Sequence, residues 1–252
     1  MKHLRFTAVL CSAALALLVG SCGGAGDKST PAADTSATKT DTATKEPEKP
    51  APVNTIDTTT THMAVIIHKV KDYSKWMTAY EADDSARTAN GLHNYVIGRG
   101  YMDTSMVMVA LKVDDVAKAK AFSKNPHLKA AMQKAGVVGQ PEIAITTTNW
   151  QDTATLTTTL RSRVLSNVKD WATWLKSFED GKQERMDNGV VDRIVGHDAD
   201  DTKKVFTVTA VTDTAKAFAY YKSDALKQRR AAGGVIGEPT RFLFNIVKRY
   251  RK

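Results

Sequence analysis

One segment of this chain occurs twice, and this duplication limits the possible folds more than any other feature. Residues 63–148 align with residues 161–246 without a gap, at an offset of 98 positions. About 25 of about 86 aligned positions are identical, which is far above coincidence. Val70-Lys71-Asp72, for example, matches Val168-Lys169-Asp170. The chain must therefore build two copies of one small structural unit.

Each copy has the pattern strand, helix, strand, strand, helix, strand. Alternating residues from Ala64 to Val70 predict a first strand, and Asp72 follows as a helix N-cap. Gly91 would end the first helix, and Asn125-Pro126 would break the second. The predicted helices are 73–90 and 114–135, and the later strands are 93–101, 105–113 and 142–148. This βαββαβ order predicts an α+β fold with two ferredoxin-like repeats.

Two runs in the first copy, His68 to Trp76 and Asn125 to Glu142, resemble small members of the dimeric α/β-barrel superfamily. That group includes the antibiotic biosynthesis monooxygenase-like proteins. The resemblance implies that two units pair sheet against sheet, here as an intramolecular pseudo-dimer within a monomer. The predicted organisation is repeat 1 at 62–149, a connector at 150–160 and repeat 2 at 161–252.

The N-terminus predicts export. Met1 to Arg5 is basic and Phe6 to Gly20 is apolar, as in a signal peptide over residues 1–21. Val19-Gly20-Ser21-Cys22 resembles the bacterial lipobox, which implies acylation of Cys22; an ordinary secretory signal is the alternative. We expect a lipid-anchored protein of the cell envelope, in the outer membrane, on either its periplasmic face or the cell surface. Residues 22–61 are poor in large apolar side chains and predict a disordered tether.

Composition excludes several other classes. The chain has no central apolar run that would span a bilayer, and its two Cys cannot form a disulfide scaffold. Removing the signal takes away two of the nine net positive charges, which leaves +7. Basic clusters at 227–230 and 248–252 would suit nucleic acid, but export argues against it, so we expect membrane lipid and a small molecule as partners. The His and Cys spacing predicts no metal site.

The resemblance implies a pocket between each sheet and its own helices. His68 would enter that pocket from the first strand, and Tyr80 would enter from the helix; both are candidate catalytic residues. Trp76 and Arg87 are candidate ligand-pocket residues. Structural interpretations are also open. His68 can be a core histidine, Trp76 can pack the helix on the sheet, and Arg87 can be a cation that suits a helix end. Repeat 2 has Ser166 in place of His68, so a His68-dependent activity would reside in repeat 1 alone.

Three functions stay open at this point. The first is a small-molecule pocket protein, including a cofactor-independent monooxygenase-like enzyme that acts on an aromatic or polyketide-like compound. The second is a non-catalytic binding module for haem or another hydrophobic ligand, and the third is a degenerate domain kept for partner contact. We expect no cofactor, with haem as the one candidate. The sequence leaves open whether the protein is an enzyme.

Overall fold

The computed structural model describes residues 54–250, which belong to one compact unit. The predicted signal peptide, Cys22 and most of the tether lie outside these residues. Within residues 54–250, no helix is both long enough and apolar enough to cross a bilayer. The two repeats have the same order of elements, which confirms the predicted α+β fold of tandem ferredoxin-like units.

Repeat 1 begins with a ten-residue strand and ends with a sixteen-residue strand. Its elements are β2 (Thr61–Val70), α1 (Tyr73–Ala82), α2 (Asp84–Ala89), β3 (Leu92–Gly100), β4 (Met106–Val113), α3 (Val116–Ser123), α4 (Pro126–Lys134) and β5 (Val137–Asp152). The predicted cap is present, because the Asp72 carboxylate accepts a hydrogen bond from the backbone N–H of Lys75. Gly91 has a φ of 69°, which a C-terminal glycine supplies at no steric cost.

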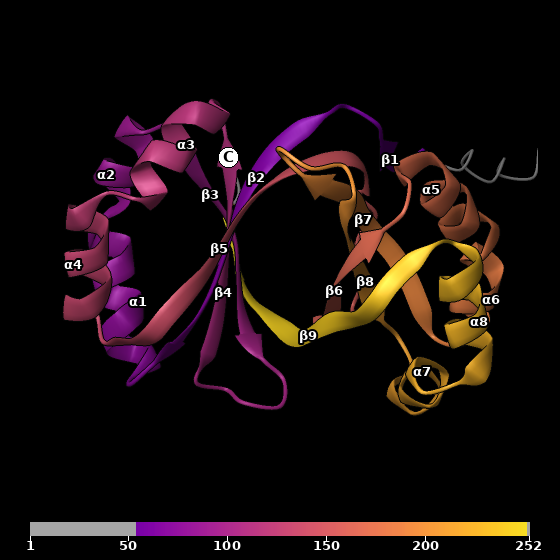
Figure 1. Ribbon diagram of the computed structural model, residues 1–252. Helices are drawn as coiled ribbons and strands as arrows, with labels where there is room; N and C mark the ends of the chain where they lie inside the picture. The colour runs from indigo at the N-terminus through magenta and orange to yellow at the C-terminus, as the bar shows by residue number, and fades with distance from the viewer. Residues whose placement is uncertain (1–53, 251–252) are drawn as a thin grey trace, which may run out of the picture. The chain divides into compact units, whose positions relative to one another are not determined.

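Repeat 2 follows the same plan. Its elements are β6 (Leu160–Val168), α5 (Trp171–Asp180), α6 (Lys182–Asp187), β7 (Val190–Asp198), β8 (Lys204–Val211), α7 (Thr214–Tyr221), α8 (Asp224–Ala232) and β9 (Val235–Arg249). Asp170 caps α5 through the backbone N–H of Thr173, as Asp72 caps α1. Figure 1 shows α1–α4 on the outer face of the strands of repeat 1, and α5–α8 on the outer face of those of repeat 2.

The strands form one antiparallel sheet in the order β1-β5-β2-β4-β3-β9-β6-β8-β7, and a further pairing of β5 with β7 closes it. Within each repeat the order is that of a ferredoxin-like unit. The repeats join at two seams, β3 with β9 and β5 with β7. Closure leaves no free edge between the repeats, as in a barrel. The predicted intramolecular pseudo-dimer is therefore the observed fold.

Some predicted boundaries differ from the structure. The tether was expected to reach Thr61, but Ile56–Asp57 form the short strand β1 on β5, and β2 already includes Thr61. The connector was expected to start at residue 150, but β5 continues to Asp152 because its end pairs with β7 of repeat 2. This seam therefore includes Trp150 and Gln151, which follow the duplicated segment, as well as the last residues of that segment.

The first predicted helix, residues 73–90, is in fact two helices separated by Asp83. Asp83 has φ −93° and ψ 14°, outside the α-helical range. Gly181 breaks the helix at the equivalent position of repeat 2 with nearly the same angles, φ −88° and ψ 4°. Because an aspartate and a glycine break at the same place, the packing of the repeat determines the break, and the residue type does not.

Three apolar layers hold the unit together. The helices of repeat 1 pack on their sheet around Trp76, Leu92 and Ile97, and those of repeat 2 pack around Trp174. A separate cluster lies between the two sheets, where Val65 and Phe244 meet from different repeats. Each helix-to-sheet layer is built mainly by one repeat, although Ala199 and Tyr250 pack against the first layer and Trp150 packs against the second. Each repeat can therefore hold a cavity with its own lining.

Candidate functional site

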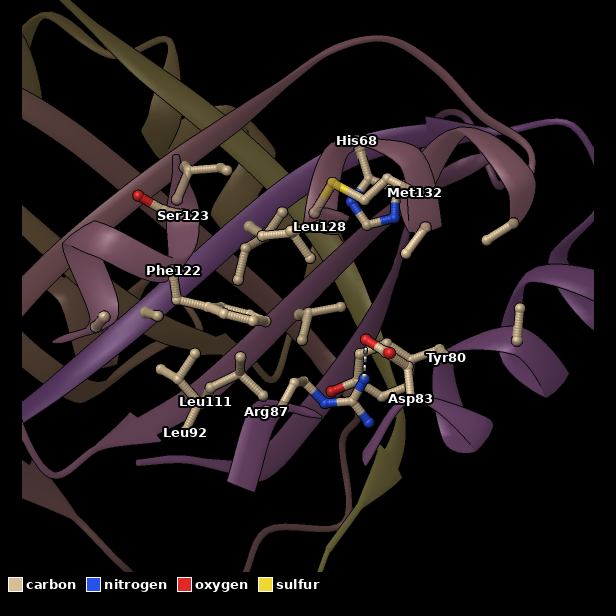
Figure 2. A pocket seen from close by; sticks show the side chains of 18 of the residues that line it. His68, Tyr80, Asp83, Arg87, Leu92, Leu111, Phe122, Ser123, Leu128 and Met132 are labelled. Carbon is tan, nitrogen blue, oxygen red and sulfur yellow. Dashed lines mark ion pairs between the residues drawn. The ribbon is translucent and has the colours of Figure 1, made fainter. Parts of the chain in front are cut away.

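The four candidate residues of repeat 1 line the same cavity, between the sheet and the helices. It has a volume of about 90 Å³ and a mostly apolar wall. His68 comes from β2, Trp76 and Tyr80 from α1, and Arg87 from α2. Figure 2 shows His68 and Arg87 entering the pocket from these separate elements. We call this the repeat 1 cavity. The four residues predicted from the sequence therefore line one cavity, and their catalytic or binding roles stay predictions.

His68 is buried, with 4% of its surface exposed. Among residues 54–250, neither ring nitrogen has a hydrogen-bond partner. The ring lies 5.4 Å from that of Trp76, centroid to centroid. Burial lowers the pKa of His68 to about 4, because the apolar wall disfavours the imidazolium. At neutral pH the imidazole is therefore uncharged and offers one N–H donor and one lone pair.

The ring of Tyr80 lines the cavity, but its hydroxyl is already hydrogen-bonded within the protein. The ring stacks on Trp76 at 5.1 Å, and the hydroxyl donates a hydrogen bond to the side-chain oxygen of Asn94 on β3. Burial raises the pKa of Tyr80, so the phenol stays protonated. Tyr80 therefore contributes an aromatic wall to the cavity. Its hydroxyl proton, which a catalytic tyrosine would donate to a substrate, is already hydrogen-bonded to Asn94.

Arg87 is a buried cation, with 4% of its surface exposed. Its guanidinium carbon lies 3.8 Å from the centroid of the Tyr80 ring, which fits a cation–π contact. It pairs with Asp83 at 3.8 Å and with Asp84 at 3.3 Å, both more exposed than the arginine. Within the described chain, its Nε has no hydrogen-bond partner. Two carboxylates thus balance its charge, while one N–H donor stays free.

The equivalent arginine of repeat 2 is fully paired. Arg185 donates from Nε and Nη2 to the two oxygens of Asp192, at 2.7 Å and 2.6 Å, and both side chains are buried. Repeat 1 has Asn94 at the position of Asp192. An amide carries no charge to pair with Arg87, and its oxygen accepts from Tyr80 instead. This single difference frees Arg87, and Asn94 was not among the residues predicted from the sequence.

Repeat 2 has a cavity in the same place, also of about 90 Å³, with a different lining. Ser166 replaces His68 and Phe178 replaces Tyr80, while Arg241 replaces an isoleucine of repeat 1. Arg241 lies over the ring of Tyr221 at 3.6 Å and donates to the hydroxyl of Ser162 at 2.5 Å. The two cavities therefore lie at equivalent places in the fold but differ in the polar side chains that line them.

The wall facing His68 comes from α3 and α4 and includes Phe122, Leu128 and Met132. These residues were not predicted as part of the site. Their spacing along the predicted helix 114–135 was the signal that could have indicated a face turned toward the sheet. No cluster of three or more His, Cys, Asp or Glu able to hold a metal ion occurs within residues 54–250.

Comparison with known proteins gives the fold a context. No family model matches the chain, and no curated protein matches it. Among solved structures, a candidate monooxygenase from Fusobacterium nucleatum aligns with a TM-score of 0.50 at 13% identity, over 76% of this chain and 97% of that one. An anthrone oxidase-like protein aligns with a TM-score of 0.50 at 10% identity, over 77% and 94%.

A ferredoxin-fold protein related to antibiotic biosynthesis monooxygenases, from Listeria monocytogenes, aligns with a TM-score of 0.42 at 7% identity, over 76% of this chain and 97% of that one. The two structures that align with a TM-score of 0.50 each cover about three quarters of this chain, in agreement with the predicted fold. At these identities the likeness shows the fold alone.

Proposed function

We propose that the repeat 1 cavity binds a small, uncharged aromatic compound that carries an acidic hydroxyl group, such as a phenol. One observation supports this most strongly: three buried nitrogens in one apolar cavity lack a partner among the described residues, Nδ1 and Nε2 of His68 and Nε of Arg87. A buried polar group left unpaired costs about 1–3 kcal/mol, so unpaired groups gathered in one cavity suggest a ligand or water there.

Charge argues for a neutral ligand. Arg87 already faces Asp83 and Asp84, and His68 is uncharged at neutral pH, so the cavity has no surplus charge to attract an anion. A phenolic hydroxyl matches either kind of free group: its O–H can donate to the imidazole lone pair of His68, or its oxygen can accept from the N–H of Arg87. The stacked rings of Trp76 and Tyr80 suit an aromatic body.

Size argues for a single ring. The cavity of about 90 Å³ is somewhat smaller than the ~150 Å³ apolar cavity that binds benzene. Leu128 and Met132 form part of its wall from α4, a helix with no fully buried side chain among the described residues. A small outward shift of α4 therefore enlarges the cavity at little cost in packing. A polyketide of several rings would need a larger opening.

Haem is a poorer fit. A buried, neutral imidazole with free nitrogens is a suitable ligand for its iron, and His68 has this character. The cavity, however, is well below the ~300–1,000 Å³ of sites that hold cofactors and drug-sized ligands. The imidazole fits haem iron as a ligand, but the cavity is too small for haem.

Oxidation of the bound compound is the second candidate function. The free N–H of Arg87 supports it, because a positive donor beside a phenol favours the electron-rich phenolate, which reacts with O₂. A balanced reaction converts two hydroquinones and O₂ into two quinones and two waters, with all four electrons from the substrate. Against this, a histidine with a pKa of about 4 is a weak base at neutral pH. Binding is therefore the function that we prefer.

The test is thermal unfolding of the full chain with Cys22→Ala, so that no acylation occurs. The additives are phenol, hydroquinone, decanoate and haemin, and the matched variant is His68→Ser, which installs the repeat 2 residue. We expect phenol or hydroquinone to raise the midpoint of the parent and to do so much less in His68→Ser. Equal shifts in both proteins, or none, would refute the site. Oxygen uptake with hydroquinone separates turnover from binding.

We further propose that acylated Cys22 anchors the protein in the cell envelope, with the folded unit outside the cytoplasm. The support is the lipobox-like run from Val19 to Cys22 behind an apolar segment. Two or more acyl chains are needed for stable anchoring. In cells fed an alkyne-labelled fatty acid, the wild type should carry the label and sediment with outer membranes, and Cys22→Ala should lose the label. Label on the variant would exclude Cys22 as the acylated residue.

A further inference from the structure

A third cavity lies between the two sheets, on the opposite face of the strands from the repeat 1 cavity. It has a volume of about 90 Å³, and we call it the barrel cavity. Met63 and Val65 of β2 reach it from repeat 1, and Arg161 and Arg163 of β6 reach it from repeat 2. These residues are equivalent in the duplicated sequence, since 63 aligns with 161 and 65 with 163. One repeat thus gives apolar side chains where the other gives arginines.

The arginines are almost completely buried: Arg161 and Arg163 are each 3% exposed, and Arg193 is 9% exposed. Arg193 pairs with Asp152 at 2.9 Å. Arg161 donates only to backbone carbonyls within the described chain, those of Thr158 at 2.8 Å and Leu160 at 2.9 Å. No carboxylate of residues 54–250 therefore balances the charge of Arg161.

Arg163 is the clearest sign of a missing partner. Its Nη1 lies 3.3 Å from Glu142, whose side chain is 50% exposed. Its Nε and Nη2 are buried and have no hydrogen-bond partner in the part of the chain that the structure describes. Burial of a cation with unpaired donors is costly, because the protein interior does not replace the lost hydration. The cavity thus holds more positive charge than its own acidic groups neutralise.

Apolar side chains also line the barrel cavity. They are Val96 and Met108 of repeat 1 and Phe206 and Phe244 of repeat 2. Phe244 is 2% exposed and belongs to the cluster between the sheets. A molecule that suits both the arginines and the apolar side chains has a negatively charged head and a short apolar body. A carboxylate matches the planar fork of a guanidinium, with two parallel hydrogen bonds.

We propose that the barrel cavity is a second ligand site, specific for a small carboxylate with a short apolar tail, with the head group held by Arg161 and Arg163. This site is distinct from the repeat 1 cavity in its position, its charge and its ligand class. The bound carboxylate accepts hydrogen bonds from Nε and Nη2 of Arg163 and supplies the counter-charge for Arg161. The tail packs against Met63 and Val65.

The test uses hexanoate and hexanol at constant ionic strength, with the full chain carrying Cys22→Ala. The two probes have the same tail and differ in charge. We expect hexanoate to raise the unfolding midpoint, and hexanol and inorganic phosphate to have little effect. The variant Arg161→Met/Arg163→Val installs the repeat 1 residues and should lower hexanoate affinity at least tenfold, while its unliganded midpoint equals or exceeds that of the parent.

Arg241→Ile is the matched control, because it removes an arginine from the other cavity of repeat 2 and installs the repeat 1 residue. It should leave hexanoate binding unchanged. If the double variant fails to fold, Arg163→Gln replaces it and should weaken binding in the same direction. Equal hexanoate binding by the parent and the double variant, loss of binding in Arg241→Ile, or no stabilisation by hexanoate would each overturn the proposal. Phenol binding lost in His68→Ser leaves this result unaffected, so the two sites are tested separately.

Discussion

Replacement of His68 by leucine should change how the stability of the protein depends on pH. The pKa of His68 is lowered from 6.5 to about 4 in the folded state, and the cause is burial. In the unfolded chain the imidazole is exposed and has its ordinary pKa. Below pH 6.5 the unfolded state therefore takes up a proton that the folded state refuses, and acid favours unfolding.

The size of this effect follows from the shift. A difference of about 2.5 pKa units, at 1.36 kcal/mol per unit, is about 3 kcal/mol. The wild type has this stability in full above pH 6.5, loses it progressively as the pH falls, and lacks it below pH 4. The leucine variant has no such loss. At pH 7.5 the variant should be as stable as the wild type or more stable by about 1–3 kcal/mol, because it buries no unpaired polar group.

Urea unfolding of both proteins at pH 7.5, 6, 5 and 4 measures the effect. Carboxylates titrate in the same range, but they are common to both proteins, so the difference between the two curves isolates His68. The advantage of the variant should grow by about 3 kcal/mol between pH 7.5 and pH 4. Parallel curves would refute the reasoning, since they would mean that His68 titrates in the folded protein as it does in the unfolded chain.

Two further predictions concern buried contacts. Arg185→Met should lower the free energy of unfolding by about 3–5 kcal/mol, because it leaves the Asp192 carboxylate buried and unpaired. Arg87→Met should lower it by less than about 2 kcal/mol, because the partners of Arg87 are more exposed. Urea unfolding of both variants measures the difference. Gly196→Ala should cost at least about 1–3 kcal/mol, since its Cβ would lie 2.1 Å from the backbone oxygen of Thr147 at the β5–β7 seam, and an unchanged unfolding midpoint would contradict this close approach of the two strands.

Much of the fold could be predicted from the sequence because its signals are local. The duplication gives two identical plans, Asp72 and Asp170 cap helices by their own side chains, and Gly91 adopts a positive φ that its position requires. The strand order follows from the βαββαβ pattern. The breaks after Ala82 and Asp180 were not predicted, because tertiary packing causes them.

The candidate site was predictable only in part. His68 and Trp76 lie on predicted elements whose apolar faces must meet, so their shared cavity follows from periodicity. The state of Arg87 does not, since it depends on how the residue on the neighbouring strand bonds in the folded repeat: Asn94 accepts from Tyr80, whereas the equivalent Asp192 accepts from Arg185. The comparison of two copies would have revealed it, because the change from aspartate to asparagine stands beside an unchanged arginine.

The barrel cavity shows the same limit. Arg161 and Arg163 alternate along a strand that is covered on both faces once the barrel closes, which is an unusual place for charge. A single repeat gives no sign of this, because its inner face is covered only by the other repeat. The closure of the sheet by β3–β9 and β5–β7 creates the cavity.

Calorimetric titration with hydroquinone tests the claim that repeat 1 alone carries the aromatic site. Wild-type protein should bind one hydroquinone per chain, and His68→Ser should bind none in the same concentration range. Two equivalent sites per chain, or unchanged binding by His68→Ser, would contradict the claim, because both outcomes would place the ligand away from the unpaired imidazole of repeat 1.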